Sequence, residues 1–395
     1  MPTPDPPRYH LEVPWTESPF FERELAARKL SPEQTERARF FHEHGYLIVE
    51  NAAPDELLDR VREQVAGLFE SSSEDPRCSG ARFQDAWKEC PAVRELAAFR
   101  PLVEVLEELY GRRPIPFQTL DFRVGSEQRA HPDTVHFNSY PPRFLAGVWV
   151  ALEDVDEDNG TLFYYPGSHR LPEAGFAELG LRVLNHNRPG ALEAFTYQDY
   201  DRFEDYVEDL MTSGGLERLD LKAPKGTALI WAAGLVHGGG QIRRPGSSRW
   251  SQVTHYYFED CLYYVPIFST PILGDLYLKK VVDVRTGEPV TARYRGLDLP
   301  ELEADGTHKL WLDISEAEGD ADGADALRRI SNYEIKHLRA DNDFLRGVEA
   351  ENANLWGMNQ RLQALLDAVE ASPSLRLGKA LTAPLRWLRR WRHGS

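Results

Sequence analysis

The sequence predicts a mainly β fold with flanking helices, built as a two-sheet jelly roll and followed by a C-terminal α-helical coiled coil. Short aromatic and β-branched runs alternate with Pro, Gly and Asn-Gly turn signals, which is typical of a series of short strands. Apolar residues then repeat in heptads near the C-terminus, which indicates the coiled coil. The strand-like runs are residues 117–124, 144–152, 162–165, 228–231 and 250–258.

Helices are predicted before the strand-rich region and inside one insertion. Ser31 is a favourable helix cap, because a proline follows it and a glutamine stands three residues later. The other predicted helices cover residues 55–69, 93–110 with a break at Pro101, and 200–211. The last of these lies in an insertion, residues 170–217, which we expect to cap the site and to select the substrate.

Length and charge narrow the class of protein. At 395 residues and 45.0 kDa, the chain has room for one catalytic core with appendages. A net charge of −17 and a pI of about 5.2 argue against a nucleic-acid partner. Three widely spaced cysteines form neither a disulfide framework nor a zinc ribbon. With no signal peptide and no run of apolar residues long enough to span a bilayer, we expect a cytoplasmic location.

Three residues are candidate metal ligands. His131 and Asp133 stand two apart, and in an extended strand they would project from one face and bind one ion. His237 ends the run GTALIWAAGLVHGGG, whose glycines let backbone approach a ligand closely. Two histidines and one carboxylate form the facial set that holds non-haem iron(II). Singly, each could be a hydrogen-bonded core residue. His136 is a rival ligand, but strict alternation points it away from the pair.

The same residues carry a family resemblance. His131-Pro132-Asp133, Trp149 in AGVWVALEDVDEDNG, the segment YYPGSH and the HGGG from His237 occur in one order and spacing. In this respect the chain resembles the phytanoyl-CoA dioxygenase family of iron(II)- and 2-oxoglutarate-dependent oxygenases, over roughly residues 31–264. The resemblance implies a cupin-like, double-stranded β-helix core, with Fe(II) and 2-oxoglutarate as cofactors.

The resemblance also implies residue roles. Arg249 would grip the distal carboxylate of 2-oxoglutarate, and Ser251 shares its strand face. Trp149 and Gln118 would line the 2-oxoglutarate pocket; the alternatives are core packing for Trp149 and a strand-edge polar group for Gln118. The implied reaction hydroxylates a small-molecule or glycan-related substrate and releases succinate and CO2. Asp133 favours hydroxylation over halogenation, because halogenases of this superfamily have a small residue there.

Two other classes of function stay open. The first is a metal-binding, cupin-like protein without 2-oxoglutarate chemistry, and Arg249-Trp250-Ser251 is the feature against it. The second is a catalytically silent assembly protein that carries the jelly roll on a coiled-coil stalk. The complete set of candidate ligands argues against this second class.

The C-terminal part of the sequence predicts the oligomeric state of the protein and its contact with a membrane. The domains expected are an N-terminal extension (1–30), the oxygenase domain (31–312), a flexible acidic linker (313–325), the coiled coil (326–371) and a basic amphipathic tail (372–395). Counting Leu338 as heptad position a places Asn352 and Asn359 at a, which favours a parallel homodimer. The alternative is a helix folded back on the oxygenase domain.

The tail interleaves Arg and Lys with Trp and Leu, which suits an anionic membrane surface. We therefore expect peripheral contact with the inner face of the membrane; the alternatives are a solvated basic end or a contact with the acidic body. The tail also resembles those of bacterial surface-polysaccharide enzymes, which implies a lipid-linked glycan as substrate.

Overall fold

The computed structural model describes residues 11–71, 75–79, 81–176, 178–181, 197–269, 275–294, 297–298 and 307–309. The predicted acidic linker, coiled coil and basic tail, residues 313–395, lie outside the described residues. So do residues 1–10 of the N-terminal extension and 182–196 of the insertion. Within the described ranges, no helix is long and apolar enough to cross a membrane.

The predicted helices are present. The Ser31 hydroxyl accepts a hydrogen bond from the Gln34 backbone N–H at 3.1 Å, and the Ser31 N–H donates to Gln34 Oε1 at 2.9 Å, which confirms the cap. Pro101 lies in the first turn of α5, so the predicted break falls between α4 and α5. The helices are α1 (Phe21–Ala27), α2 (Pro32–His44), α3 (Asp55–Ser71), α4 (Pro91–Ala97), α5 (Arg100–Tyr110) and α7 (Tyr197–Ser213).

Two antiparallel sheets form the jelly roll, which confirms the predicted fold class. The larger sheet has the order β1 (Tyr46–Val49), β8 (Ala228–Ala232), β5 (Leu145–Ala151), β10 (Ser251–Phe258), β3 (Pro114–Phe122) and β2 (Arg82–Gln84). The smaller sheet has the order β7 (Leu219–Asp220), β6 (Leu162–Tyr164) and β9 (His237–Gly239). Three two-stranded ribbons are β4 (Asn138–Tyr140) with β11 (Leu262–Tyr264), β12 (Asp275–Tyr277) with β15 (Thr307–Lys309), and β13 (Arg293–Tyr294) with β14 (Leu297–Asp298).

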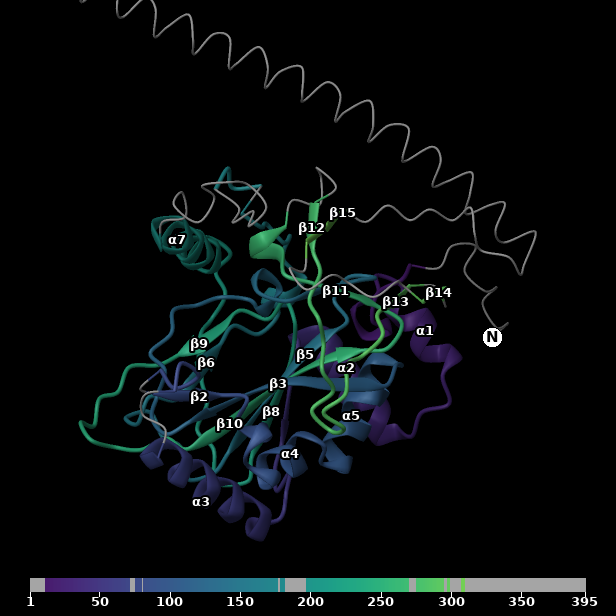
Figure 1. The fold of residues 1–395 in the computed structure, drawn as a ribbon. Coiled ribbons are helices and arrows are strands. Elements are labelled where there is room, and N and C mark those ends of the chain that lie inside the picture. The colour runs from purple at the N-terminus through teal and green to yellow at the C-terminus, as the bar shows by residue number, and fades with distance from the viewer. Residues whose placement is uncertain are drawn as a thin grey trace, which may run out of the picture. The chain divides into compact units, whose positions relative to one another are not determined.

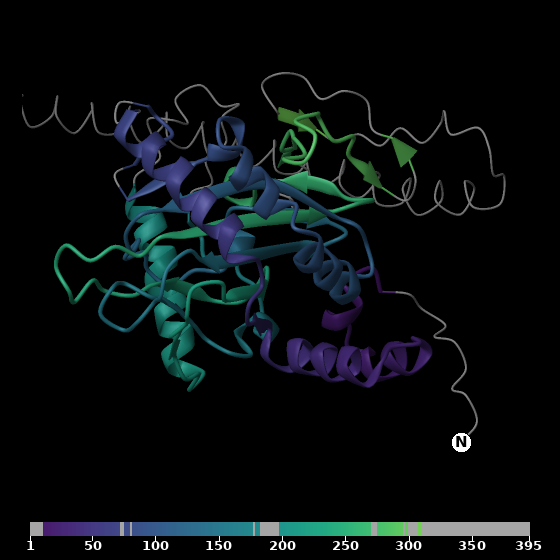
Figure 2. The ribbon, with the colours of Figure 1, turned by 90° about the horizontal axis from the view of Figure 1, so that it is seen from below.

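Side chains of the larger sheet alternate between two apolar layers. On β5, Val148 and Val150 join the core beneath the helices, whereas Trp149 and Ala151 join the core between the two sheets. Helices α3, α4 and α5 cover the outer face of this sheet (Figures 1 and 2). The inner face, which carries Trp149, is therefore the face on which a site between the sheets is built.

Segments at both ends of the described chain pack onto this core. The buried Trp15 donates its indole N–H to the Glu108 carbonyl oxygen at 2.9 Å, so residues before α1 lie against α5. Late in the chain, Val281 and Val284 are buried in the core beneath the helices. The turn that follows is closed by a 2.7 Å hydrogen bond from Gly287 N–H to Asp283 O.

Candidate metal centre and cofactor pocket

His131 and His237 are joined through their backbones. The N–H of His131 donates to the His237 carbonyl at 2.9 Å, and the N–H of His237 donates to the His131 carbonyl at 3.0 Å. Such a reciprocal pair places both side chains on one face. Their ring centroids are 4.8 Å apart. Residues separated by about a hundred positions in the sequence are thus held as neighbours by β9 and the segment before η3 (Asp133–Val135).

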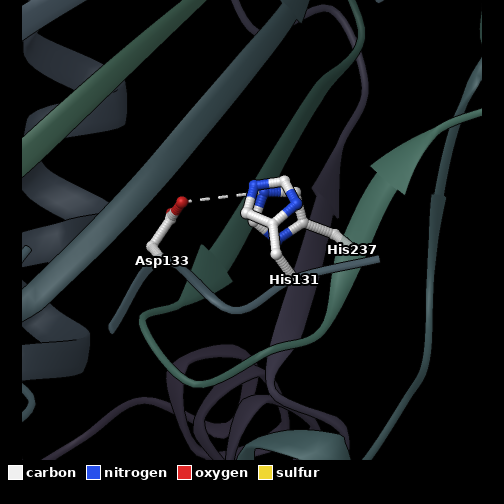
Figure 3. A group of neighbouring side chains, drawn as sticks. All are labelled: His131, Asp133 and His237. Atoms are coloured by element: carbon white, nitrogen blue, oxygen red, sulfur yellow. Dashed lines mark ion pairs between the residues drawn. The ribbon is translucent and has the colours of Figure 1, made fainter. Parts of the chain in front are cut away.

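Asp133 reaches the pair by a different route from the one predicted. The sequence predicts an extended strand through His131 and Asp133, but Asp133 begins the short 3-10 helix η3. The backbone N–H groups of His136 and Phe137 both donate to the Asp133 carbonyl at 2.9 Å, which turns the chain. Its Oδ1 lies 3.8 Å from His237 Nε2, and one ligand atom from each of the three residues falls within 4.8 Å of the others (Figure 3).

The protonation of the two imidazoles suits a metal. The Nδ1 atom of His131 bonds to the Arg129 carbonyl at 2.8 Å and that of His237 bonds to the Leu235 carbonyl at 3.0 Å, so the proton is assigned to Nδ1 in each ring. Each Nε2 then carries the lone pair that can bind an ion, and that of His131 accepts a hydrogen bond from Gln128 Nε2 at 3.2 Å, a contact that a bound ion would displace. Burial lowers the pKa of His131 to about 3, which keeps it neutral. These buried donors fit a divalent cation such as iron(II).

Two residues that the sequence argument missed support Asp133. Trp231 donates its indole N–H to Asp133 Oδ2 at 2.7 Å, and His255 Nε2 lies 3.5 Å from the same oxygen. Burial alone would raise the pKa of Asp133, but His255 and His237 hold it well below its ordinary value, so the carboxylate is ionised. His255 could have been found from the sequence, because it is four residues after Ser251 on one strand and so shares its face.

Arg249 and Ser251 form the pair that was predicted. The guanidinium Nη1 donates to Ser251 Oγ at 2.6 Å, and Nε donates to the Gly160 carbonyl at 3.2 Å. Arg249 is only 3% exposed, and burial lowers its pKa to about 10. Within the described part of the chain, no carboxylate lies at ion-pair distance from it. A buried cation without an anion is costly, so this site suits an anionic ligand.

The three candidate ligands and Arg249 line one cavity of about 410 Å³, and Ser251 lies behind Arg249 as its hydrogen-bond partner. Gln118 and Trp149, which the sequence predicts to line a 2-oxoglutarate pocket, lie on the wall of this cavity, and Trp149 is also fully buried in the core between the sheets. The Trp149 indole nitrogen has no hydrogen-bond partner among the described residues. His136 faces the same cavity, where its Nε2 lies 2.9 Å from the hydroxyl of Tyr200 on α7. The insertion therefore contributes at least Tyr200 to the cavity wall.

The glycines after His237 allow chain segments to meet. A side-chain carbon at Gly238 would lie 2.7 Å from the Gln128 carbonyl oxygen, and one at Gly239 would lie 2.8 Å from the Glu127 nitrogen. The sequence predicts that these glycines let backbone approach a ligand, and both line the cavity. The structure shows in addition that they admit the segment that leads to His131.

Comparison with known proteins agrees with this geometry. The family model for "Phytanoyl-CoA dioxygenase (PhyH)" matches residues 41–250, more than half of the chain. A probable phytanoyl-CoA dioxygenase of Caenorhabditis elegans is 24% identical over 263 residues, which are 60% of this chain and 78% of the relative. The peroxisomal phytanoyl-CoA dioxygenase of Homo sapiens is 23% identical over 252 residues, with 58% and 69% covered.

Solved structures of similar fold include EctD from S. alaskensis with 2-oxoglutarate and 5-hydroxyectoine. It has a TM-score of 0.47 and 17% identity, and the match covers 67% of this chain and 87% of EctD. The epimerase SnoN, in complex with Fe3+, alpha ketoglutarate and nogalamycin RO, has a TM-score of 0.44 and 21% identity, with 66% and 97% covered.

Proposed function

The chain belongs to the phytanoyl-CoA dioxygenase family of iron- and 2-oxoglutarate-dependent dioxygenases, and on this premise we propose that it hydroxylates a small organic substrate. The observation that carries the proposal is the sharing of one cavity by two sites. A buried His-Asp-His group lies in the same cavity as a buried arginine that has no anionic partner among the residues the structure describes. A metal needs the first site and the free carboxylate of a dicarboxylate needs the second, so a metal and a dicarboxylate can bind together in this cavity.

Each residue has a distinct task in this proposal. His131, Asp133 and His237 would hold iron(II) through one ligand atom each, which would leave the metal able to bind 2-oxoglutarate and dioxygen as well. Iron(II) bound with 2-oxoglutarate and dioxygen supplies an oxidant that hydroxylates a C–H bond and leaves succinate and carbon dioxide. Arg249 and Ser251 bind the distal carboxylate of 2-oxoglutarate through charge-assisted hydrogen bonds.

Residues around the metal group orient it and exclude water. Trp231 fixes one oxygen of Asp133, which directs the other oxygen toward His237. The indole of Trp149 covers the cavity wall beside the guanidinium of Arg249, whose carbon lies 5.9 Å from its ring centroid. Where apolar groups such as this indole form the wall, they strengthen the charged contacts beside them.

Metal content and succinate release test this proposal together. The full chain, reconstituted with iron(II) without oxygen, should bind one iron and, once oxygen is admitted, should turn 2-oxoglutarate into succinate slowly even without its substrate. His131→Ala, Asp133→Ala and His237→Ala should each abolish both, because one of three ligands is lost. His136→Ala is the matched control and should keep its iron. Iron that survives His237→Ala and is lost in His136→Ala would show that the ligand assignment is wrong.

The substrate and partners are proposed from the C-terminal sequence. We propose a small molecule or a lipid-linked glycan as substrate, a parallel homodimer through residues 326–371, and contact of residues 372–395 with the inner membrane face. Light scattering and flotation with anionic liposomes test both parts. A chain cut after Ser372 should remain a dimer but should no longer bind anionic liposomes. A chain cut after Asp325 should be monomeric and should not bind the liposomes. A monomeric full chain that ignores anionic liposomes refutes both parts.

A further inference from the structure

Arg82 is a second arginine in the same cavity. It lies on β2, where Arg82 and Gln84 face the cavity and Phe83, between them, is buried in the core beneath the helices. Arg82 is half-buried, and its guanidinium has no hydrogen bond or ion pair with any residue that the structure describes. Burial lowers the pKa of Arg82. An arginine that faces a cavity and has no protein partner for its charge is available to an anionic ligand.

With iron(II) and 2-oxoglutarate in the cavity, the positive charge of Arg82 has no negative charge to balance it. Asp133 is the only carboxylate among the described residues that line the cavity. In the proposed complex, the two positive charges of iron(II) and the one of Arg249 balance the two negative charges of 2-oxoglutarate and the one of Asp133. The charge of Arg82 then remains, inside a chain whose net charge is −17. Attraction to an anionic substrate is therefore a local property of this cavity.

The neighbours of Arg82 in the cavity are neutral hydrogen-bonding groups. His136 and Tyr200 are bonded to each other at 2.9 Å. Burial lowers the pKa of His136 to about 4, so this imidazole is uncharged near neutral pH. Gln84 and Gln128 contribute amides to the same wall. An oxyanion is met there by one cation and several polar groups, whereas a cationic group is repelled.

We propose that Arg82 anchors the substrate through an anionic oxyacid group, a carboxylate or a phosphate. This inference rests on the proposed function, because it assigns the substrate class of the same cavity. The planar guanidinium binds either oxyanion through two parallel hydrogen bonds, which fixes orientation as well as position. The anchored group lies on the cavity wall formed by β2, and the rest of the substrate extends into the cavity that holds the metal group.

Anion binding to the non-reacting complex tests this proposal. The full chain is loaded with manganese(II) and saturating 2-oxoglutarate without oxygen, so that Arg249 is occupied and no turnover occurs. Inorganic phosphate and acetate are then titrated separately by calorimetry. We expect at least one to bind with a Kd of the order of 1–10 mM, because a single guanidinium supplies the affinity. The tighter of the two identifies the oxyacid.

Variants separate Arg82 from general charge. Arg82→Gln should weaken the anion roughly tenfold or more, and Arg82→Lys should recover part of the loss. Arg123→Gln is the matched control, because Arg123 is an exposed arginine next to Phe122, the β3 partner of Arg82, and should change nothing. Binding of 2-oxoglutarate should stay normal in all three variants, which shows that the site is intact.

Three results would each refute the proposal that Arg82 binds an anionic group of the substrate. These are no saturable binding of either anion to the loaded wild-type chain, equal affinity in Arg82→Gln and wild type, or an equal loss in Arg123→Gln. If the chain binds neither manganese nor 2-oxoglutarate, the proposed function itself fails. That failure appears in the loading step, before any anion is added, so the two failures are distinguishable.

Discussion

Replacing Arg249 by methionine separates a binding role from a structural one. The folded-state pKa of about 10, against 12.5 for a free guanidinium, corresponds to roughly 3 kcal/mol of unfavourable burial of the charge. The hydrogen bonds to Ser251 and Gly160 offset about 1 kcal/mol each. Without 2-oxoglutarate, Arg249→Met should therefore leave the free energy of unfolding unchanged or raise it by about 1 kcal/mol.

The same change should nearly abolish co-substrate binding. A buried carboxylate that loses its charged partner is destabilised by about 3–5 kcal/mol, which weakens binding roughly 100- to 3,000-fold. Arg249→Lys keeps the charge but not the fork, and should fall between wild type and methionine. Iron content should stay normal in both variants, because Arg249 is not a proposed ligand.

Urea denaturation and calorimetry with manganese(II) and 2-oxoglutarate measure the two effects. The expected pattern is a stable variant that does not bind. A variant that loses more than about 2 kcal/mol of stability and still binds 2-oxoglutarate would refute the reasoning, since Arg249 would then serve the fold. Unchanged titrations in both variants would favour a cupin-like protein that binds metal alone.

Three further predictions concern buried contacts. Trp231→Phe removes the donor to Asp133 and should weaken iron binding about 10- to 100-fold in a chelator competition, with the fold retained. Gly147→Ala would place a side-chain carbon 2.2 Å from the Trp231 ring and should lower the free energy of unfolding by about 1–3 kcal/mol. Burial raises the pKa of Glu17 from 4.5 to about 7, although Arg143 opposes this. The folded chain then keeps a proton that the unfolded chain releases, so stability falls by roughly 1–3 kcal/mol as the pH rises from about 4.5 to 7. Glu17→Gln should remove that fall in urea denaturation; a fall of equal size in the variant would rule out Glu17 as its source.

Local sequence signals predicted what depends on local geometry. The contact between Arg249 and Ser251 follows from residues two apart facing one way. The same rule failed between His131 and Asp133, because the chain turns into a 3-10 helix after Pro132. The two histidines still come together through the bridge between residue 131 and β9, which no local pattern encodes, and the turn into η3 brings Asp133 to them.

Contacts made through packing were not predictable from the sequence. Arg82 follows a polar stretch and lies on a strand of three residues, too short for an alternating pattern to appear. Its place in the cavity is set by the pairing of β2 with β3. The place of Tyr200 in the cavity was not predictable either. The sequence predicts the helix, but which of its side chains face the cavity depends on how α7 packs. Residues that choose a substrate are thus less visible in a sequence than those that hold a cofactor.

The backbone pairing of His131 with His237 has a consequence for how this enzyme can diversify. The pairing fixes both ends of an intervening chain that includes strands of both sheets. Within it, the pairing of β6 with β7 also fixes the ends of the segment that carries α7. The cost of closing such a segment grows only slowly with its length, so it can be lengthened, shortened or exchanged while the two imidazoles keep their spacing. Natural variation or directed evolution can therefore change the part of the cavity wall that the α7 segment forms while His131, Asp133 and His237 stay in place.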